Sequence, residues 1–363
     1  MGTRPLTKIL FISRAYPPIV GGIENQNYEL SVWLSKIADV TTIVNRKGKK
    51  ALPWFLPITA LRTLWIASRY DAIVLGDGVL GIIGFLCKKI HPNIPVIAVV
   101  HGLDLTYTSA LYQKWWVRTF LPALDKLIAV GNETIRVGVE RSIPENKFVF
   151  IPNGVNTDTY FHTHDRSELE QLLGQSLEGK KVILTLGRLA KRKGVAWFIL
   201  NVFPHLSHDT LYIVAGDGVD KENIRNAIQE TNLSSRIHTF GFVDHTTRNI
   251  LLNTCDLFVQ PNIRITGDME GFGISVIEAA SCQLPVVASR LEGLKDAIQD
   301  GESGFLVEAE NADAYREKIQ TLLADKDALV QFGIRARQYI IDHFHWSSVS
   351  KRYLDAIDAT IKH

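Results

Sequence analysis

Short apolar runs alternate with segments of helical period along most of this chain. The runs at 8–13 and 181–186 are rich in Ile, Leu, Val and Phe. Such runs are typical of strands buried on both faces of a parallel sheet, whose strands are joined by helices. The pattern therefore predicts an α/β protein. It predicts two doubly wound parallel sheets, because the series restarts near residue 181.

The two series are separated by Pro-Asn-Gly at 152–154, which predicts a turn or hinge. We therefore expect two Rossmann-like domains, 1–160 and 161–345. A C-terminal segment, about 346–363, has an amphipathic helical period that suits packing on either domain, including a return to the first. Strands are expected at 8–13, 39–44, 71–76, 96–100, 127–130, 148–151, 181–186, 211–215, 237–240, 257–259 and 285–288, with helices at 23–36 and 195–203.

Composition and cysteine content indicate a cytoplasmic globular protein. The 363 residues are 46% hydrophobic and 21% charged, which suits two well-buried domains. Three scattered cysteines form no disulfide or metal-ligand pattern. The first apolar run is too short for a secretory signal. The stretches 51–67 and 72–87 are interrupted by proline or charged residues, so no transmembrane helix is expected.

The two halves differ in charge, although the net charge is only +2. Residues 1–150 contain 18 Lys and Arg against 10 Asp and Glu, whereas residues 151–345 contain 19 against 26. Basic charge with tryptophan suits an anionic membrane surface. Alternatively, the tryptophans fill core and domain-interface pockets and the lysines are solvated. No nucleic-acid-binding signature is present, so nucleic acid is not an expected partner. The tryptophans of the basic half are Trp33, Trp54, Trp65, Trp115 and Trp116.

A glycine-rich segment at 17–24 joins the first predicted strand to the first helix. At Gly21 and Gly22 the backbone can approach a ligand, either a phosphate or the acceptor, which the amides at the start of the helix would face. The segment is not the dinucleotide fingerprint G-x-G-x-x-G, which disfavours a dehydrogenase. A tight strand-to-helix turn would select the same glycines, so both interpretations stay open.

A basic segment at 187–194 follows the first strand of the second half, at the carboxyl edge where open α/β sheets bind ligands. Arg188 and Lys193 are candidates for neutralising a diphosphate leaving group, because a guanidinium fork and an ammonium oppose the charge that grows on it. The alternative is a solvated basic turn, which we expect for Lys191 and Arg192 in particular.

Glu270 and Glu278 enclose a loop that runs into a helix. Glu270 can accept hydrogen bonds from sugar hydroxyls and Glu278 from ribose hydroxyls, while the amides between them face an anion. Both carboxylates must address neutral groups, because they would repel a phosphate. The alternative is a helix cap at Glu270 and an ordinary, partly exposed helix residue at Glu278. The amides concerned belong to Gly271, Phe272, Gly273 and Ile274.

These segments resemble, in the same order, the motifs of the retaining glycosyltransferases of family 4, which have the GT-B architecture of two Rossmann-like domains facing a central cleft. The resemblance covers nearly the whole chain. One departure lies at 291–298, which reads Leu-Glu-Gly-Leu-Lys-Asp-Ala-Ile where the family often has Gly-Gly-x-x-Glu. The matching segments are the glycine-rich loop 18–24, His-Gly-Leu-Asp at 101–104, the Pro-Asn-Gly-Val hinge at 151–156, Gly-Arg to Lys-Gly at 187–194 and E-x7-E at 270–278.

The resemblance implies a hexosyltransferase whose nucleotide-sugar donor is held by the second domain and whose acceptor is held by the first. A UDP-sugar is the first expectation for the donor and GDP-mannose the second. The implied acceptor is a glycan or lipid-linked intermediate of cell-surface polysaccharide or glycolipid synthesis, at the inner face of the cytoplasmic membrane. Neither a metal nor a cofactor is implied.

The same resemblance implies roles for individual residues. Arg188 and Lys193 would bind the diphosphate, Glu270 the sugar and Glu278 the ribose. His101 would lie over the transferred sugar, although a lone histidine after a strand is more often structural. The remaining implied contacts are Gly218, Phe242 and Val243 for the base and Glu24 and Asp104 for the acceptor.

Two other functions stay open. A sugar-nucleotide epimerase of related form would isomerise the donor without an acceptor. A non-catalytic scaffold would bind nucleotide or membrane without turnover, but it would be free to lose the cations and carboxylates named above. For transfer with retention, the resemblance favours front-face attack with the departing phosphate as base over a covalent carboxylate intermediate, because no nucleophile is evident.

Overall fold

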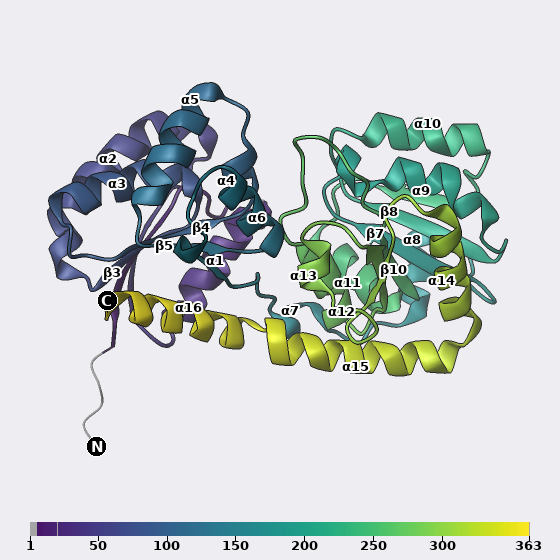
Figure 1. Cartoon of the computed structure of the whole chain (residues 1–363). Coiled ribbons are helices and arrows are strands. Elements are labelled where there is room, and N and C mark those ends of the chain that lie inside the picture. The colour runs from purple at the N-terminus through teal and green to yellow at the C-terminus, as the bar shows by residue number, and fades with distance from the viewer. Residues whose placement is uncertain (1–5, 20, 363) are drawn as a thin grey trace, which may run out of the picture. The chain divides into compact units, whose positions relative to one another are not determined.

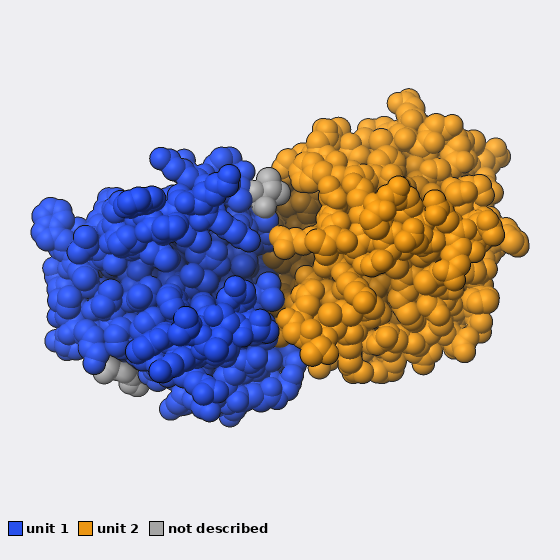
Figure 2. Space-filling view, turned by 90° about the horizontal axis from the view of Figure 1, so that it is seen from above, with its two compact units in different colours: residues 1–154, 346–363 blue, residues 155–345 orange. Residues whose placement is uncertain are grey.

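The chain forms two compact units, which Figure 2 shows in separate colours. The computed structural model describes residues 6–19 and 21–362. Unit 1 is the chain up to Gly154 together with the helix that begins at Trp346, and unit 2 runs from Val155 to His345. The division falls directly after Pro-Asn-Gly, a few residues before the expected boundary at 160.

Unit 1 contains a six-stranded parallel sheet in the order β2-β1-β3-β4-β5-β6. Every residue of its central strands β3 and β4 is buried, as expected where helices cover both faces of a sheet (Figure 1). Its strands are β1 (Lys8–Ser13), β2 (Asp39–Val44), β3 (Ala72–Leu75), β4 (Val96–Val100), β5 (Lys126–Ala129) and β6 (Phe148–Phe150). Its helices are α1 (Gly22–Leu34), α2 (Leu52–Ile66), α3 (Gly81–Ile90), α4 (Leu103–Thr106), α5 (Ala110–Tyr112), the π-helical η4 (Gln113–Phe120), α6 (Asn132–Glu140) and α16 (Trp346–Ile361).

The C-terminal helix α16 returns to unit 1 and packs on α1. Trp346, Tyr353 and Ile357 of α16 are buried, and Thr7 donates a hydrogen bond of 2.8 Å to Asp358. Gly154 lies against the Trp346 ring, where a Cβ atom would come within 2.5 Å of the indole. The glycine of Pro-Asn-Gly therefore serves this close approach in addition to the turn.

Unit 2 contains a second six-stranded parallel sheet, in the order β12-β11-β10-β7-β8-β9. Observed and predicted strands agree to within one residue at each end, but the three-residue edge strand β12 was not predicted. Its strands are β7 (Lys181–Leu186), β8 (Thr210–Ala215), β9 (Ile237–Phe240), β10 (Leu257–Gln260), β11 (Val286–Ser289) and β12 (Phe305–Val307). Its helices are α7 (Thr157–Tyr160), α8 (Arg166–Leu173), α9 (Val195–Asn201), α10 (Lys221–Thr231), α11 (His245–Thr254), α12 (Ile274–Ser281), α13 (Leu294–Ala297), α14 (Ala312–Ala324) and α15 (Lys326–Phe344).

Candidate active site

The strand order of unit 2 places the candidate donor residues at a topological switch point. β7 lies between β10 and β8, and the chain proceeds from β7 towards β8 on one side and from β10 towards β11 on the other. Open α/β sheets bind ligands beyond the carboxyl ends of strands at such a point. The loop 187–194 follows β7 and the loop 261–273 follows β10, so both predicted donor segments lie at this edge of the sheet.

The two loops contact each other directly. Ile263 donates a backbone hydrogen bond of 2.9 Å to the carbonyl of Arg192. Gly194 has φ +66° and lies so close to Pro261 that a Cβ atom would come within 1.9 Å of the proline carbonyl oxygen. A side chain at Gly194 would therefore push the two loops apart, so this glycine has a structural reason that the sequence pattern did not reveal.

Glu270 is the centre of a buried polar cluster between these loops. Its Oε2 atom lies 2.6 Å from Nζ of Lys193 and 2.5 Å from Nη1 of Arg192, and it accepts a hydrogen bond of 3.2 Å from Asn262. The three charged side chains are only 10–14% exposed. Within the described part of the chain no hydrogen bond reaches Oε1 of Glu270, so this oxygen is free to accept one from a ligand.

Arg192 is not the solvated residue that the sequence predicts. We expected it to be a solvated residue of the basic turn, but its guanidinium pairs with Glu270 and, through Nε at 3.1 Å, with Asp268. Both carboxylates belong to the loop after β10, which neighbours β7 in the sheet. The strand order, which periodicity does not give, brings these charges together.

The pKa values in this cluster reflect burial opposed by ion pairing. Burial alone would raise the pKa of Glu270, but Lys193 and Arg192 lower it to about 2. Burial lowers the pKa of Lys193 from its ordinary value, although Glu270 opposes this shift. The carboxylate and the ammonium form an ion pair, and Lys193 is already partnered before any donor binds.

Arg188 differs from the other cations of the loop because it is exposed and unpaired. It follows β7 directly, and in the described residues its guanidinium forms no ion pair or side-chain hydrogen bond. Lys191 is likewise exposed. A free guanidinium at a switch point is suited to bind an anion, because no internal partner has to be displaced.

The segment from Gly271 to Ile274 leads into α12, which begins at Ile274 with Gly273 (φ 94°) as its N-cap. Among the described residues, the amides of Gly271, Phe272 and Gly273 form no backbone hydrogen bond, which leaves them available to an anion. The Phe272 side chain is buried, with its ring 5.8 Å from that of Phe344.

The segment 291–298, which differs from the motif that the family often has there, contacts the backbone of Glu270. Glu292 accepts a hydrogen bond of 2.6 Å from the backbone amide of Glu270, and the amide of Gly293 donates to the carbonyl of Glu270 at 3.1 Å. Glu292 adopts φ 48°, an uncommon conformation for a residue with a side chain. This turn therefore holds the backbone of Glu270 on both sides.

Glu278 is buried within α12, and its carboxylate forms an ion pair with Arg248 of α11. The Arg248 guanidinium lies 4.6 Å from the centre of the Tyr160 ring. The alternative of an ordinary, partly exposed helix glutamate is therefore wrong. Arg248 was not identified from the sequence, because a single arginine in a polar helix belongs to no recognisable motif.

The candidate base-binding residues follow β8 and β9 at the same edge of the sheet. Phe242 is 73% exposed and Val243 is half-buried. Gly218 lies against Leu189, where a Cβ atom would come within 2.2 Å of the leucine carbonyl oxygen. Backbone packing alone thus requires glycine at Gly218, whatever the ligand contacts are.

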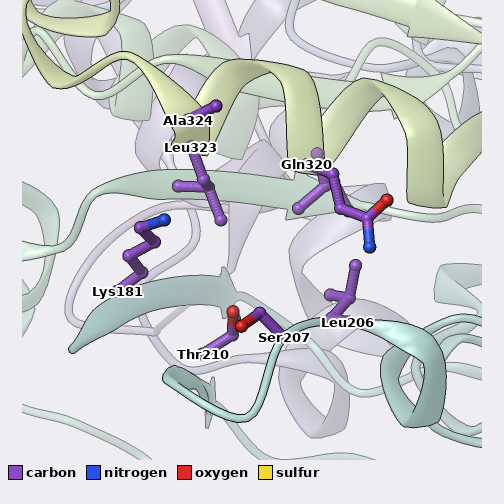
Figure 3. Close-up of a pocket in the computed structure, with 8 residues that line it drawn as sticks. Lys181, Leu206, Ser207, Thr210, Gln320, Leu323 and Ala324 are labelled. Atoms are coloured by element: carbon purple, nitrogen blue, oxygen red, sulfur yellow. The ribbon is translucent and has the colours of Figure 1, made fainter.

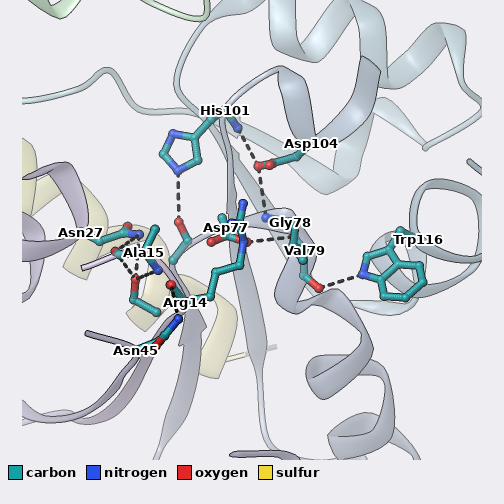
Figure 4. Close-up of polar contacts among 12 residues, drawn as sticks. Arg14, Ala15, Asn27, Asn45, Asp77, Gly78, Val79, His101, Asp104 and Trp116 are labelled. Carbon is teal, nitrogen blue, oxygen red and sulfur yellow. Dashed lines mark hydrogen bonds and ion pairs between the residues drawn. The ribbon is translucent and has the colours of Figure 1, made fainter. Parts of the chain in front are cut away.

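Unit 1 has a second buried polar cluster, at the switch point between β1 and β3 (Figure 4). His101, at the end of β4, has its Nε2 atom 3.0 Å from the carbonyl oxygen of Gly76. Oδ2 of Asp104 accepts hydrogen bonds of 3.1 Å from the amides of His101 and Gly78. Asp104 therefore links the backbone of His101 to that of Gly78.

Arg14 and Asp77 belong to the same cluster but were not identified from the sequence. Nε of Arg14 lies 2.9 Å from Oδ1 of Asp77, whose side chain is fully buried. Among the described residues, Oδ2 of Asp77 has no hydrogen-bond partner. An unpartnered carboxylate oxygen at this depth is costly, which suggests a functional reason for the arrangement.

Replacing Asp77 by asparagine should change how stability depends on pH. Burial raises the pKa of Asp77 from 3.8 to about 6, with Arg14 opposing and Asp104 adding to the shift. A raised folded-state pKa means that the wild type loses stability as pH rises through this window. The free energy of unfolding of Asp77→Asn, relative to wild type, should therefore rise by about 2 kcal/mol from pH ~4 to pH ~7. Urea unfolding across this range measures the difference, and a flat difference would contradict the assignment.

The glycine-rich loop lies partly outside the described residues, which omit Val20. Gly21 is the N-cap of α1, which begins at Gly22. The Glu24 carboxylate folds back towards this turn, so that a Cβ atom at Gly21 would come within 2.1 Å of it. Glu24 is thus directed towards its own loop, and a side chain at Gly21 would have to displace only the flexible end of Glu24.

A hollow of about 190 Å³ lies at the opposite, amino-terminal edge of the sheet in unit 2 (Figure 3). Lys181 and Thr210, the first residues of β7 and β8, line it together with Gln320 and Leu323 of α14. Because it lies beyond the amino ends of the strands, it is separate from the residues at the switch point.

Comparisons with known proteins cover most of the chain. The family model described as "Glycosyltransferase Family 4" matches residues 20–159, and the model described as "Glycosyl transferases group 1" matches residues 173–339. A GDP-mannose-dependent α-(1-6)-phosphatidylinositol monomannoside mannosyltransferase of Mycolicibacterium smegmatis is 23% identical, over 96% of this chain and 98% of that protein. An N,N'-diacetylbacillosaminyl-diphospho-undecaprenol α-1,3-N-acetylgalactosaminyltransferase of Campylobacter jejuni is 29% identical, over 73% and 70%.

Solved structures show the fold. HepE of Anabaena, in complex with UDP and glucose, has a TM-score of 0.77 at 19% identity and covers 97% of this chain and 100% of its own. The catalytic domain of starch synthase IV from Arabidopsis thaliana, bound to ADP and acarbose, has a TM-score of 0.80 at 13% identity, covering 99% and 100%. The chain belongs to glycosyltransferase family 4, and its two parallel sheets have the GT-B fold.

Proposed function

We propose that this protein is a retaining hexosyltransferase that moves a sugar from a nucleotide diphosphate donor to a glycan or lipid-linked acceptor. The observation that carries the proposal is the switch point of unit 2. There the free guanidinium of Arg188 lies on the same sheet edge as the Lys193–Glu270 ion pair and the open amides before α12. This set offers cations to a diphosphate and a carboxylate oxygen to hydroxyl groups.

In the proposed reaction the bond between the anomeric carbon of the sugar and the phosphate oxygen breaks. The acceptor hydroxyl forms a new bond on the same face, and its proton passes to the departing phosphate. Arg188 and the amides of Gly271 to Gly273 would oppose the charge that grows on the leaving group. Lys193 would join them if the donor draws its ammonium away from Glu270. The carboxylate of Glu270 would accept a hydroxyl of the sugar, and Glu278 would accept those of the ribose. No metal or cofactor is part of this proposal.

The proposed donor is a UDP-hexose, with GDP-mannose second. The relatives named above include a GDP-mannose-dependent enzyme, and a relative from Escherichia coli, 24% identical over 74% of this chain, is named for UDP-Gal. Several of these names specify a phosphatidylinositol or diphospho-undecaprenol acceptor. We therefore propose a lipid-linked acceptor at the inner face of the cytoplasmic membrane.

A thermal-shift screen of UDP-, GDP- and ADP-sugars should identify the donor. A ligand that binds only the native state, present at 100 times its Kd, stabilises by about 2.7 kcal/mol. One nucleotide series should therefore raise the melting temperature, and that of the Arg188→Ala variant should rise less at equal donor concentration. Absence of any shift with all three series would contradict nucleotide-sugar binding.

The product of the reaction then separates the possible functions. Transfer with retention predicts an α-linked product from an α-linked donor, which the anomeric proton coupling in NMR reports. An isomerised nucleotide sugar formed without acceptor would identify an epimerase. Binding without turnover, across a panel of polyprenyl-diphosphate-linked and free glycan acceptors, would favour a scaffold.

A further inference from the structure

Helix α2 of unit 1 has its apolar face directed outward. Trp54, Ile58, Leu61 and Trp65 are 75%, 62%, 71% and 77% exposed. Their spacing of four, three and four residues places them on one side of the helix. A surface helix of a globular domain normally turns such a stripe towards the core.

The face of α2 that packs on the unit carries both threonines and apolar residues. Thr59 and Thr63 are buried, together with Ile66. Among the described residues the Thr63 hydroxyl has no hydrogen-bond partner. The helix is therefore apolar on nearly all sides. Its outward stripe leaves large apolar side chains in contact with water, which soluble domains use mainly for binding sites.

The stretch of sequence that contains α2 carries charges of one sign only. Residues 40–70 contain six Lys and Arg and no Asp or Glu. Arg62 is exposed on the helix itself, and the guanidinium of Arg69 lies 5.4 Å from the centre of the Trp65 ring. The six cations are Arg46, Lys47, Lys49, Lys50, Arg62 and Arg69.

A second segment of unit 1 repeats this composition. Tyr107, Leu111 and Trp115 are 61%, 70% and 45% exposed, and residues 105–124 contain Lys114 and Arg118 but no acidic residue. Helix α3 contacts both α2 and η4, so the two segments flank one helix (Figure 1). Trp116 is different, because its indole donates a hydrogen bond of 2.7 Å to the carbonyl of Val79. Because Trp54 and Trp65 are 75% and 77% exposed, the alternative that the tryptophans fill buried pockets is wrong for these two residues.

We propose that the outward face of α2 (Trp54, Ile58, Leu61 and Trp65) docks on an anionic lipid bilayer, with the helix lying in the plane of the interface. Tryptophan and aliphatic side chains at the lipid interface, with Lys or Arg beside them, bind in this way. Trp54 and Trp65, near the two ends of the stripe, are suited to the headgroup boundary.

The geometry fits a bilayer better than other occupants. The 15 residues of α2 span about 22 Å, which is short of the ~30 Å hydrocarbon core. None of the described helices is long and apolar enough to cross a membrane. A second copy of the chain would bring two sets of six cations together without an anion between them, which opposes self-association. Phospholipid headgroups supply the missing negative charge.

Vesicle sedimentation with the full chain and without donor tests this proposal. A negative result would reject membrane docking by α2 but would not contradict the proposed transfer reaction. Wild type should pellet with phosphatidylcholine vesicles that contain phosphatidylglycerol, and much less with phosphatidylcholine alone. Trp54→Gln/Trp65→Gln should weaken the partition by at least about tenfold, and Lys49→Glu/Lys50→Glu by a similar factor at low salt. Both pairs are exposed, so circular dichroism and melting temperature should stay unchanged.

The matched control is Val330→Gln/Ile334→Gln on α15, where both side chains are also exposed apolar residues on a helix. This variant should bind vesicles like the wild type. Equal binding by the tryptophan variant, or no binding by the wild type, would overturn the proposal. A wild-type dimer in solution that the tryptophan variant loses would assign the face to a second copy instead.

Discussion

Replacing Glu270 by alanine should destabilise unit 2 and abolish most activity. The substitution leaves Lys193, whose side chain is only 10% exposed, without an ion-pair partner among the described residues. Arg192 keeps its ion pair with Asp268. Breaking a buried ion pair by removing one partner costs about 3–5 kcal/mol, because the remaining charge is uncompensated. Denaturant unfolding followed by circular dichroism measures this loss.

The control for Glu270→Ala is Glu308→Ala, which breaks an exposed ion pair with Arg290. Exposed pairs contribute about 0–1 kcal/mol, so this variant should unfold almost like the wild type. Glu270→Gln adds a second test, because it retains the size and hydrogen-bonding capacity of the side chain but not its charge. If Glu270→Ala costs no more than the Glu308 variant, the ion-pair cluster is not what holds the loops after β7 and β10 together.

The strands were predictable because the information is local. A strand buried on both faces, such as β4 or β7, consists of consecutive apolar residues that stand out against polar surroundings. β12 lacks this signal, because it has three residues and lies at the sheet edge. For helix α2 the apolar signal is strong, but an apolar composition on nearly all sides does not reveal which face turns outward.

The candidate site was predictable only where a residue follows a strand. Arg188 and Lys193 follow β7, so the rule that ligands bind at the carboxyl edge placed their loop at the site, but it did not distinguish them from Arg192. The partners within the site could not be predicted in this way. Arg192 lies 78 residues from Glu270 in sequence, and Arg14 lies 63 residues from Asp77. Which loops meet depends on the order of strands in the sheet, and apolar periodicity carries no information on that order.

Replacing Arg188 by alanine should lower activity without the loss of stability that we expect for Glu270→Ala. Arg188 is exposed and unpaired within the described residues, so its removal should change the free energy of unfolding by less than about 0.5 kcal/mol. If its guanidinium opposes the charge on the leaving diphosphate, kcat/KM should fall by about a hundredfold, which corresponds to about 3 kcal/mol of transition-state stabilisation. Initial rates with the donor found by thermal shift measure this change.

Lys191→Ala is the matched control for Arg188→Ala, because Lys191 is an exposed cation of the same loop, three residues further along the chain. A general effect of positive charge on the loop would lower kcat/KM similarly in both variants, and added salt would weaken it. A specific contact with the diphosphate would appear only at Arg188, and Arg188→Lys would restore part of the rate but not the fork of two parallel hydrogen bonds. Near-wild-type turnover by Arg188→Ala would leave the diphosphate to Lys193 and the amides before α12. In that case the donor would have to break the ion pair between Lys193 and Glu270 before Lys193 could bind the diphosphate. Arg188 has no such ion pair among the described residues.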